Sequence, residues 1–317
     1  MIDPKIALVM ARPRPEINAD HDMPLLLRAL SEAGADAIST EWDDPGVDWS
    51  QFDLAVIRST WDYTWRKPEF LDWVDLCSRA TRLVNPPEVV RWSSDKSYLG
   101  TLAAAGVPVV RTRYLAPGDP ADLPDDHEYV LKPVIGAGAR YAARYRPEQN
   151  DEAREQVARM HAEGLTAILQ PYMSGIDATG ERALVFVRGR FLHAIRKNAV
   201  LSPDVPFDQR KVAHPGIQPW SPTPADLAVA ERALATVPGA ADLLYARVDL
   251  VDSADGTPVV MELELVEPNL FLAVHPGSMA TVVQAITTTA ATAALQRRTQ
   301  RRTQRRSEDD RAVHERR

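Results

Sequence analysis

The sequence has one cysteine, Cys77, in 317 residues. A single thiol excludes an internal disulfide framework and any metal site with several thiolate ligands, so we expect a reducing, cytoplasmic environment and a buried Cys77. Threonine and glutamine interrupt the apolar stretch 279–295, which argues against a membrane span of roughly 20 apolar residues. The only apolar run near the N-terminus, residues 6–11, is too short for an export signal.

Two common nucleotide-binding fingerprints are also missing. Neither GxxxxGK[ST] nor GxGxxG occurs, which excludes a P-loop and a standard dinucleotide-binding turn. The charge is uneven, because the last 21 residues hold nine arginines and four carboxylates, whereas residues 1–296 hold 28 basic and 40 acidic residues. Such an acidic body is not expected to bind nucleic acid.

The basic tail, residues 296–317, repeats the units QRRT, QRRT and QRRS. Arginines four residues apart on a helix repel each other by roughly 0.2–0.5 kcal/mol per pair. We therefore expect the tail to be frayed or disordered. Binding of RNA or another anionic partner is the alternative.

The first ninety residues alternate between strand and helix patterns. Apolar runs at 5–11, 35–42 and 52–60 predict strands, and the amphipathic segment 23–34 predicts a helix. This order indicates a parallel sheet, whose ligands collect beyond the carboxyl ends of the strands. The side chains predicted there are Arg12, Arg58, Ser59 and Thr60.

A second unit is predicted after Pro86 and Pro87, which interrupt the pattern. Its first helix is expected from about Ser93 or Ser94 to Gly106. The elements expected after it are a strand at 128–134, a helix at 148–163, a strand at 166–173, a hairpin at 181–197 and a helix at 223–237. The proline-rich segment 202–222 is predicted to be a long functional loop.

Acidic side chains alternate with apolar ones in segment 245–265. A turn at 254–257 pairs Ser253 with Pro258, which places Asp249 opposite Glu262 and Arg247 opposite Glu264. Carboxylates that face each other destabilise a sheet unless a cation lies between them, and Mg²⁺ takes such oxygen ligands. The alternatives are a solvated face balanced by arginines and, less well supported, calcium.

Lys132 lies in an otherwise apolar strand and is followed by the small residues of the GAGA turn, 136–139. Small residues let backbone N–H groups approach phosphate oxygens, while a lysine supplies positive charge, so this pair predicts a nucleotide-phosphate site. An ordinary turn is the alternative. Arg182, Arg196 and Lys197 on the next hairpin are predicted to neutralise a transferred phosphoryl group, with solubilising surface charge as the alternative.

In this order the segments resemble the ATP-grasp superfamily over about residues 90–275. The matching features are DKxxL at Lys96, LKP at Lys132, the glycine turn, QPYM at 170–173, the pair Glu181 and Arg182, and D…ExE at Asp249, Glu262 and Glu264. The resemblance implies an α/β and α+β protein with the ATP-grasp fold and an N-terminal Rossmann-like (pre-ATP-grasp) domain. Many members have Asn where Glu264 stands, which adds a negative charge here.

The resemblance also implies roles for individual residues. Magnesium, with manganese as an alternative, would be held by Asp249, Glu262 and Glu264. The catalytic cations would be Arg182, Arg196 and Lys197. The ATP-binding residues would be Lys96, Lys132, Gly136, Gly138, Gln170, Pro171, Tyr172, Met173, Asp177 and Glu181. Pro171 lacks a backbone donor at the adenine-binding strand.

Segments 58–66, 70–73 and 262–272 more narrowly resemble the O-ureido-D-serine cyclo-ligases of D-cycloserine biosynthesis. Such enzymes would convert the substrate carboxylate into an acyl phosphate that the ureido nitrogen attacks, releasing ADP, phosphate, carbon dioxide and ammonia. The substrate residues expected are Arg58, Ser59, Thr60, Asp62 and Tyr63, with Glu267, Asn269 and His214 second in rank. Arg58 would hold the carboxylate and Asp62 the ammonium, while nearby aromatic side chains exclude water. A helix cap with core aromatics is the alternative.

The expected domains are 1–92 on the substrate side, 93–172 and 173–295 as the two ATP-grasp subdomains, and the tail 296–317. The predicted partner is a small-molecule carboxylate, with no membrane and an oligomer left open. A linear carboxylate–amine ligase of the same superfamily is the first alternative function. A non-catalytic nucleotide-binding protein with an anion-binding tail is the second.

Overall fold

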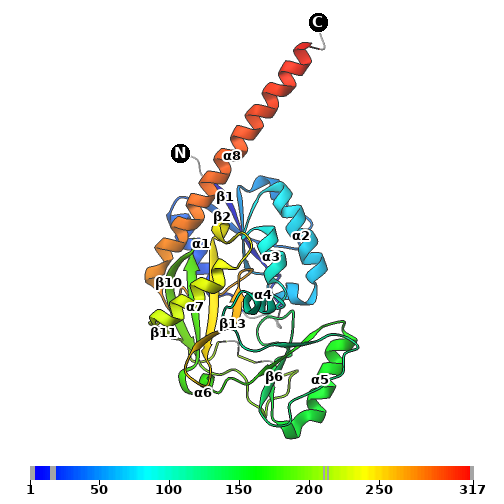
Figure 1. Cartoon of the computed structure of the whole chain (residues 1–317). Coiled ribbons are helices and arrows are strands. Elements are labelled where there is room, and N and C mark those ends of the chain that lie inside the picture. Colours follow the sequence, from blue (N-terminus) through cyan, green and yellow to red (C-terminus); the bar gives the residue numbers. More distant parts are fainter. Residues whose placement is uncertain (1–3, 15–18, 210, 213, 315–317) are drawn as a thin grey trace.

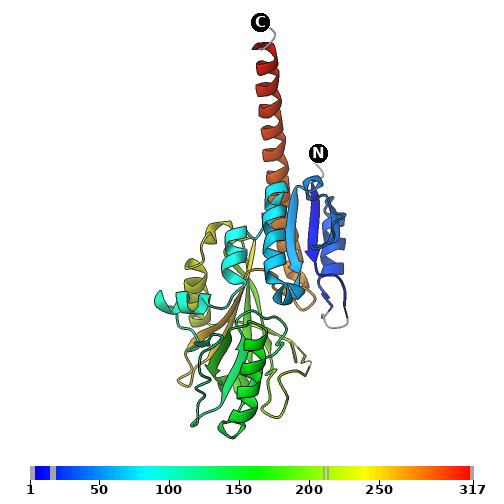
Figure 2. The same cartoon turned by 90° about the vertical axis from the view of Figure 1, so that its right-hand side faces the viewer.

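The computed structural model describes residues 4–14, 19–209, 211–212 and 214–314. Its strands form three sheets, which have four, five and four strands. Figures 1 and 2 show the N-terminal unit in blue, the β6 and α5 unit in green at the opposite end, and the long helix α8 leaving the body.

The N-terminal sheet is parallel and has the strand order β2-β1-β3-β4. This confirms the predicted β-α-β pattern. Its strands are β1 (Lys5–Met10), β2 (Asp36–Glu41), β3 (Leu54–Ser59) and β4 (Arg82–Val84), and its helices are α1 (Met23–Glu32) and α2 (Lys67–Ala80). Short 3₁₀ turns, η1 (Trp49–Gln51) and η2 (Trp61–Trp65), precede β3 and α2.

The single helix expected from Ser93 or Ser94 to Gly106 was wrong. The structure has two helices, α3 (Pro87–Ser93) and α4 (Tyr98–Ala104). Proline is tolerated in the first turn of a helix, so Pro87 begins α3 instead of preventing a helix. Between the helices, the Lys96 amide donates to the Val134 carbonyl at 2.9 Å, which ties this break to the second unit.

A four-stranded antiparallel sheet follows, with the order β5-β8-β6-β7. Its strands are β5 (Arg113–Leu115), β6 (Tyr129–Pro133), β7 (Ala143–Tyr145) and β8 (Ala167–Pro171). The 3₁₀ turn η3 (Pro147–Gln149) leads into α5 (Asn150–Ala162), whose Ala153, Val157 and Met160 pack on the sheet. These apolar residues form a core of their own.

The central sheet is antiparallel and has the order β11-β10-β9-β12-β13. Its strands are β9 (Glu181–Val187), β10 (Arg190–Lys197), β11 (Gln218–Trp220), β12 (Tyr245–Asp252) and β13 (Pro258–Glu264), and nearby lie α6 (Gly175–Thr179), α7 (Pro224–Ala235) and η4 (Ala240–Asp242). The hairpin predicted at 181–197 is confirmed, and its turn lies at Arg188 and Gly189. One face of this sheet packs against α4 and α7.

The pairing of β12 with β13 confirms the predicted positions of the charged residues, although the turn differs from the predicted one. The turn pairs Asp252, and not Ser253, with Pro258. A bulge then skips Met261, so that Asp249 still lies opposite Glu262 and Arg247 opposite Glu264. Bulges next to functional sites commonly re-aim side chains in this way.

Helix α8 (Met279–His314) follows η5 (Pro276–Ser278) and buries Val282, Ile286 and Ala290 in the core. The structure continues this helix through residues 296–314, so the expected fraying was wrong for that range, while residues 315–317 lie outside the described residues. Good helix formers and the buried first turns outweigh the small arginine repulsion.

The segment Pro276–Gln300 has the length and apolar composition of a membrane span, the one such segment in the part of the chain that the structure describes. Of its most apolar window, 44% is buried inside the protein. The apolar side chains of α8 pack between the N-terminal sheet and the central sheet, as in a core helix of a soluble protein. This packing explains the composition without a membrane.

Candidate functional site

Ionisable side chains gather on the face of the central sheet opposite α7. Alternation along each strand brings four strands' charges to this one face. We call this group the charged cluster. It consists of Glu181 on β9, Lys197 on β10, Arg247 and Asp249 on β12, and Glu262 and Glu264 on β13.

Asp249 lies at the centre of the cluster and is 2% exposed. Its carboxylate accepts from Arg247 at 2.8 and 2.9 Å and from Lys197 at 3.1 Å. Lys197 also contacts Glu181 at 2.6 Å. Burial alone would raise the pKa of Asp249, but the two cations hold it well below its usual range, whereas burial raises the pKa of Glu181 to about 8.

Lys96 and Lys132 reach this cluster from the second unit. The Lys96 ammonium lies 3.0 Å from Glu262 and donates to the Gly136 carbonyl at 2.7 Å. Burial would raise the pKa of Glu262, but the charges of Lys96 and Lys132 lower it overall. Lys132 has no ion pair within 4.0 Å among the described residues, and burial lowers its pKa. The structure therefore brings both predicted lysines close to the carboxylates of β13.

Two other buried carboxyl groups have raised pKa values. Burial and the neighbouring Asp249 and Glu262 raise the pKa of Glu264 to about 7, although Arg247 contacts it. Burial and Glu264 likewise raise the pKa of Glu267 to about 8. An added cation would lower both pKa values, so the two carboxyl groups are compatible with a bound cation nearby.

The donor set suits magnesium held jointly with phosphate. In the described part of the chain, no group of three or more His, Cys, Asp or Glu side chains could hold a metal by itself. Asp249 is already engaged by Arg247 and Lys197, so the expected three-carboxylate set is not preformed. Glu262 and Glu264 remain as oxygen donors, and Mg²⁺ typically takes one or two carboxylates plus phosphates.

The glycine turn has tight backbone geometry. Gly138 has a φ of 63°, in the left-handed region that favours glycine. A Cβ on Gly136 would stand 3.1 Å from the Pro133 ring, so this backbone packs closely on the end of β6. The Gly136 carbonyl accepts from the Lys96 ammonium, so the turn lies beside that lysine.

The expected adenine strand forms the end of β8 and the turn into α6. Gln170 is buried and donates to Thr112 at 2.9 Å, while Pro171 pairs with Tyr129 on β6. Tyr172 donates to Asp177 at 2.6 Å and lies under the Arg144 guanidinium. Met173 packs against the apolar cluster of Val110, Val251 and Val259, on which Met261 of β13 also packs. The segment therefore runs along the boundary of the two sheets.

Arg182 and Arg196 are not brought to the cluster, which corrects their predicted placement. Arg182 forms two bonds to Asp252, at 2.6 and 2.7 Å, and lies 3.2 Å from Asp226 of α7. Arg196, its register partner, donates to Gln218. Since neighbouring strand residues point to opposite faces, Glu181 and Lys197 face the cluster while these two arginines face away.

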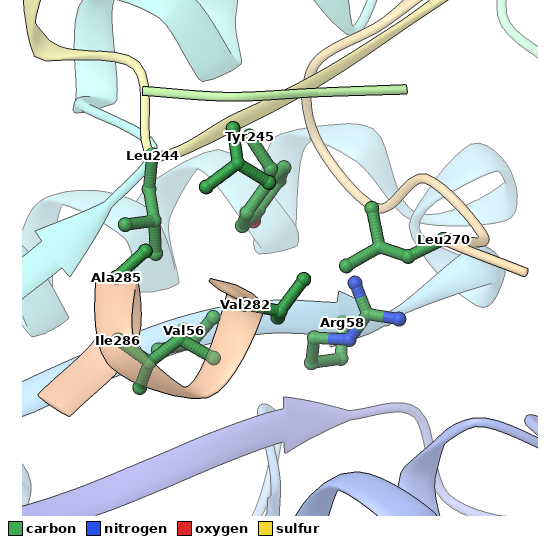
Figure 3. A pocket seen from close by; sticks show the side chains of 9 residues that line it. Val56, Arg58, Leu244, Tyr245, Leu270, Val282, Ala285 and Ile286 are labelled. Carbon is green, nitrogen blue, oxygen red and sulfur yellow. The ribbon is translucent and has the colours of Figure 1, made fainter. Parts of the chain in front are cut away.

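Arg58 is 1% exposed at the end of β3. Its guanidinium donates to the Pro268 carbonyl at 3.1 Å and has no carboxylate within 4.0 Å among the described residues. Figure 3 shows it beside Leu270 and Val282 at an apolar cavity of about 10 Å³, which is too small for a substrate. The structure places Arg58 as a brace of the loop after β13, and it buries Ser59 and Thr60 too.

Asp62 and Tyr63 do not join Arg58, contrary to expectation. Asp62 is fully buried, accepts from the Trp42 indole at 2.8 Å and lies 3.8 Å from Arg66. Tyr63 stacks on Phe70 at 4.9 Å. These contacts place both residues in the core between the N-terminal sheet and α2. Burial, together with the field of Glu267, Glu262 and Glu264, raises the pKa of the Tyr63 hydroxyl.

The loop after β13 joins the cluster to the N-terminal unit. The Glu267 carbonyl accepts from the Trp61 indole at 3.3 Å, and the Asn269 carbonyl accepts from Arg247 at 3.3 Å. His214 packs its ring on Phe271 of the same loop. Glu267, Asn269 and His214 are therefore brought close to the cluster.

Arg247 is an important site residue that the sequence pattern did not identify. It is 1% exposed and contacts Asp249, Glu264 and Asn269. A buried arginine on the same strand face as a metal-site carboxylate was visible in the alternation of segment 245–250. It was interpreted only as a balancing charge.

Comparison with known proteins agrees with this geometry. The family model described as the N-terminal domain of D-cycloserine synthetase DcsG matches residues 6–85. The cycloserine biosynthesis protein DcsG of Streptomyces lavendulae is 39% identical over 283 residues, which cover 84% of this chain and 93% of that protein.

Solved structures give the same result for the fold. The crystal structure of D-cycloserine synthetase DcsG matches with a TM-score of 0.80 and 38% identity, over 91% of this chain and 99% of that one. An ATP-grasp RimK domain protein from Sphaerobacter thermophilus matches with a TM-score of 0.62 and 18% identity, over 88% and 97%. The chain therefore belongs to the DcsG family and is a carbon–nitrogen ligase with the ATP-grasp fold.

Proposed function

We propose that this protein is an ATP-dependent cyclo-ligase that closes the ring of D-cycloserine from O-ureido-D-serine. The observation that carries the proposal is the 39% identity to the cycloserine biosynthesis protein DcsG over 283 residues. The charged cluster supports it, since acyl phosphate formation depends on positioning and charge neutralisation more than on a side-chain nucleophile.

ATP binds between the second unit and the central sheet in this proposal. Lys96 and Lys132 hold phosphate oxygens, and the backbone at Gly136 and Gly138 surrounds them. The adenine lies along Gln170–Met173, with Asp177 or Glu181 near the ribose. This arrangement is supported by the position of both lysines near Glu262, and by the packing of Met173 on the apolar cluster that also contacts Met261 of β13.

Arg247 and Lys197 serve as the catalytic cations, in place of Arg182 and Arg196. The substrate carboxylate oxygen attacks the γ-phosphorus, and ADP leaves. The ureido nitrogen then attacks the acyl carbon and phosphate leaves, after which water releases the carbamoyl group as carbon dioxide and ammonia. Two buried cations stabilise the negative charge on the transferred group, because burial strengthens their field.

Glu262 and Glu264 hold the divalent cation, for which magnesium is preferred and manganese is the alternative, with Asp249 orienting the two catalytic cations. When bound, the metal neutralises phosphate charge. The raised pKa of Glu264 supports a place for added positive charge. Both glutamates project from one strand edge toward Lys96 and Arg247.

The substrate lies on the side of the N-terminal unit, near Glu267 and Asn269. Glu267 is a buried carboxyl beside Trp61, and an ammonium group bound next to it would lower its pKa and favour its charged form. We propose the division 1–92, 93–172 and 173–295 for the substrate-side domain and the two ATP-grasp subdomains. A cytoplasmic location follows from the need for ATP.

The deciding experiment incubates the protein with ATP, Mg²⁺ and O-ureido-D-serine and detects D-cycloserine by mass. We expect D-cycloserine and ADP in equal amounts. ADP formation that requires a second, separate amine, with no D-cycloserine, would replace this proposal with a linear carboxylate–amine ligase. Absence of ADP with every carboxylate tested would favour a nucleotide-binding protein without turnover.

A further inference from the structure

Phe271 has an unusual backbone conformation next to the charged cluster. Its φ is 53°, in the left-handed region that non-glycine residues rarely adopt. Its side chain is 2% exposed, so the ring is packed inside the protein. Such strain persists only where the surroundings fix the backbone, and it concentrates at functional sites.

Three sets of hydrogen bonds fix this turn. The Phe271 amide donates to the Asn269 side chain at 2.8 Å. The Phe271 carbonyl accepts from Val274 and His275 at 3.0 and 3.1 Å. One residue earlier, the His193 ring bonds to the Leu270 carbonyl at 2.8 Å. The direction in which the Phe271 ring points is therefore determined by the whole loop.

The ring points at Arg247. The guanidinium carbon lies 5.4 Å from the ring centroid, within the range of a cation–π contact. The neighbouring Asn269 carbonyl accepts from the same guanidinium at 3.3 Å. On another side of the ring, His214 makes an edge contact at 5.1 Å, which connects the proline-rich segment to the same residue.

The contacts of Arg247 are of two kinds. Asp249 and Glu264 hold it by charge. Under the proposed function a triphosphate and a cation compete for these same charged partners. Phe271 and the Asn269 carbonyl are uncharged, so their contacts persist. A misplacement of a catalytic group by about 1 Å costs on the order of 100-fold in rate. Uncharged contacts that hold the guanidinium in place would therefore protect the rate of the reaction.

We propose that Phe271 is the positioning residue that keeps Arg247 aimed at the transferred phosphoryl group while its ionic partners change. This inference rests on the proposed role of Arg247. The strained turn allows the ring to lie against the guanidinium. His214, from the proline-rich segment, packs on the same ring and helps to hold it there.

The test uses Phe271→Leu, which removes the ring at similar backbone strain, and Phe186→Leu as its matched control. Phe186 is 1% exposed and lies on the other face of the central sheet, away from Arg247. Both variants remove one buried ring, so both lower the melting temperature. The measurements are kcat for ADP release, melting temperature, and the affinities for ADP and for a non-hydrolysable ATP analogue.

We expect Phe271→Leu to lower kcat by roughly 10- to 100-fold, and Phe186→Leu to leave kcat within about threefold of wild type. Because the effect acts through Arg247, Phe271→Leu should add no further loss in an Arg247→Lys background. The analogue should lose affinity in Phe271→Leu more than ADP does, since only the analogue carries a γ-phosphate.

Equal kcat losses in both Phe→Leu variants, or losses that multiply in the Arg247→Lys background, would overturn the proposal. Failure of the ring-closing function is distinguishable from this. If the wild type makes no D-cycloserine, the comparison of analogue and ADP affinities across the same four variants still shows whether Phe271 acts through Arg247. Analogue affinity that is unchanged by Phe271→Leu contradicts the positioning role under either outcome.

Discussion

Replacing Arg182 with methionine should destabilise the protein without impairing the chemistry. Arg182 joins two carboxylates, Asp252 through two bonds of 2.6 and 2.7 Å and Asp226 at 3.2 Å. The side chains of Arg182 and Asp226 are 4% and 3% exposed, so water cannot replace the lost partner. Removing one member of a buried ion pair typically costs about 3–5 kcal/mol.

For a chain of this size that loss corresponds to a fall in melting temperature of the order of 5 to 15 °C. Differential scanning calorimetry measures the fall, and kcat for ADP release is compared at a temperature where both proteins are folded. Arg196→Met is the matched control, because Arg196 lies on the neighbouring strand, contacts Gln218 and the Trp220 ring near the surface, and has no carboxylate within 4.0 Å among the described residues. We expect a small thermal effect for it.

The reasoning is refuted if Arg182→Met melts like the wild type yet loses ADP release by a factor of about 100 or more. That result would mean that the guanidinium contacts the transferred phosphoryl group after all. A large thermal loss with kcat near wild type supports the structural role seen here.

Three further predictions concern the site and the tail. Glu262→Gln should abolish ATP consumption while circular dichroism stays native, because one oxygen donor beside Lys96 loses its charge; near-normal turnover contradicts its role. The pKa of Glu267 is raised to about 8, so this side chain binds its proton more tightly in the folded state than in the unfolded state. The free energy of unfolding of the wild type, relative to Glu267→Gln, should therefore fall by up to about 1.4 kcal/mol per pH unit as the pH rises from 4.5 to 8. Denaturation measured against pH tests this, and equal pH dependence of the two proteins would contradict the raised pKa. Truncation after Leu295 should leave kcat for ADP release unchanged, whereas a large loss would give the helical tail a role in turnover.

Periodicity was sufficient to predict most elements of the fold. The parallel sheet follows from continuous apolar runs, and the β12–β13 hairpin follows from the alternation of apolar and charged residues; both patterns depend only on local geometry. The Asp249–Glu262 pairing was also correct, although the turn was placed one residue away, because a bulge at Met261 compensated. Bulges arise from packing between distant segments, so the local pattern does not reveal them.

The errors in the site have a common origin. Arg182 and Arg196 were grouped with Lys197 by charge, although alternation already separates neighbouring residues onto opposite faces. Arg58 and Asp62 were paired because they are close in sequence, yet one braces a distant loop and the other bonds to Trp42. Which charges meet depended on contacts between units, and a single strand pattern carries no information about those.

The position of α8 has a consequence for which parts of the protein open together. Its apolar side chains share one core with β1, β3 and β9, so the N-terminal sheet and the central sheet are joined. The β5-β8-β6-β7 sheet has a separate core with α5. Amide hydrogens of β6 and β8 should therefore exchange independently of those in β3 and β9. Entry of the nucleotide should then depend on tilting of the β5-β8-β6-β7 sheet alone.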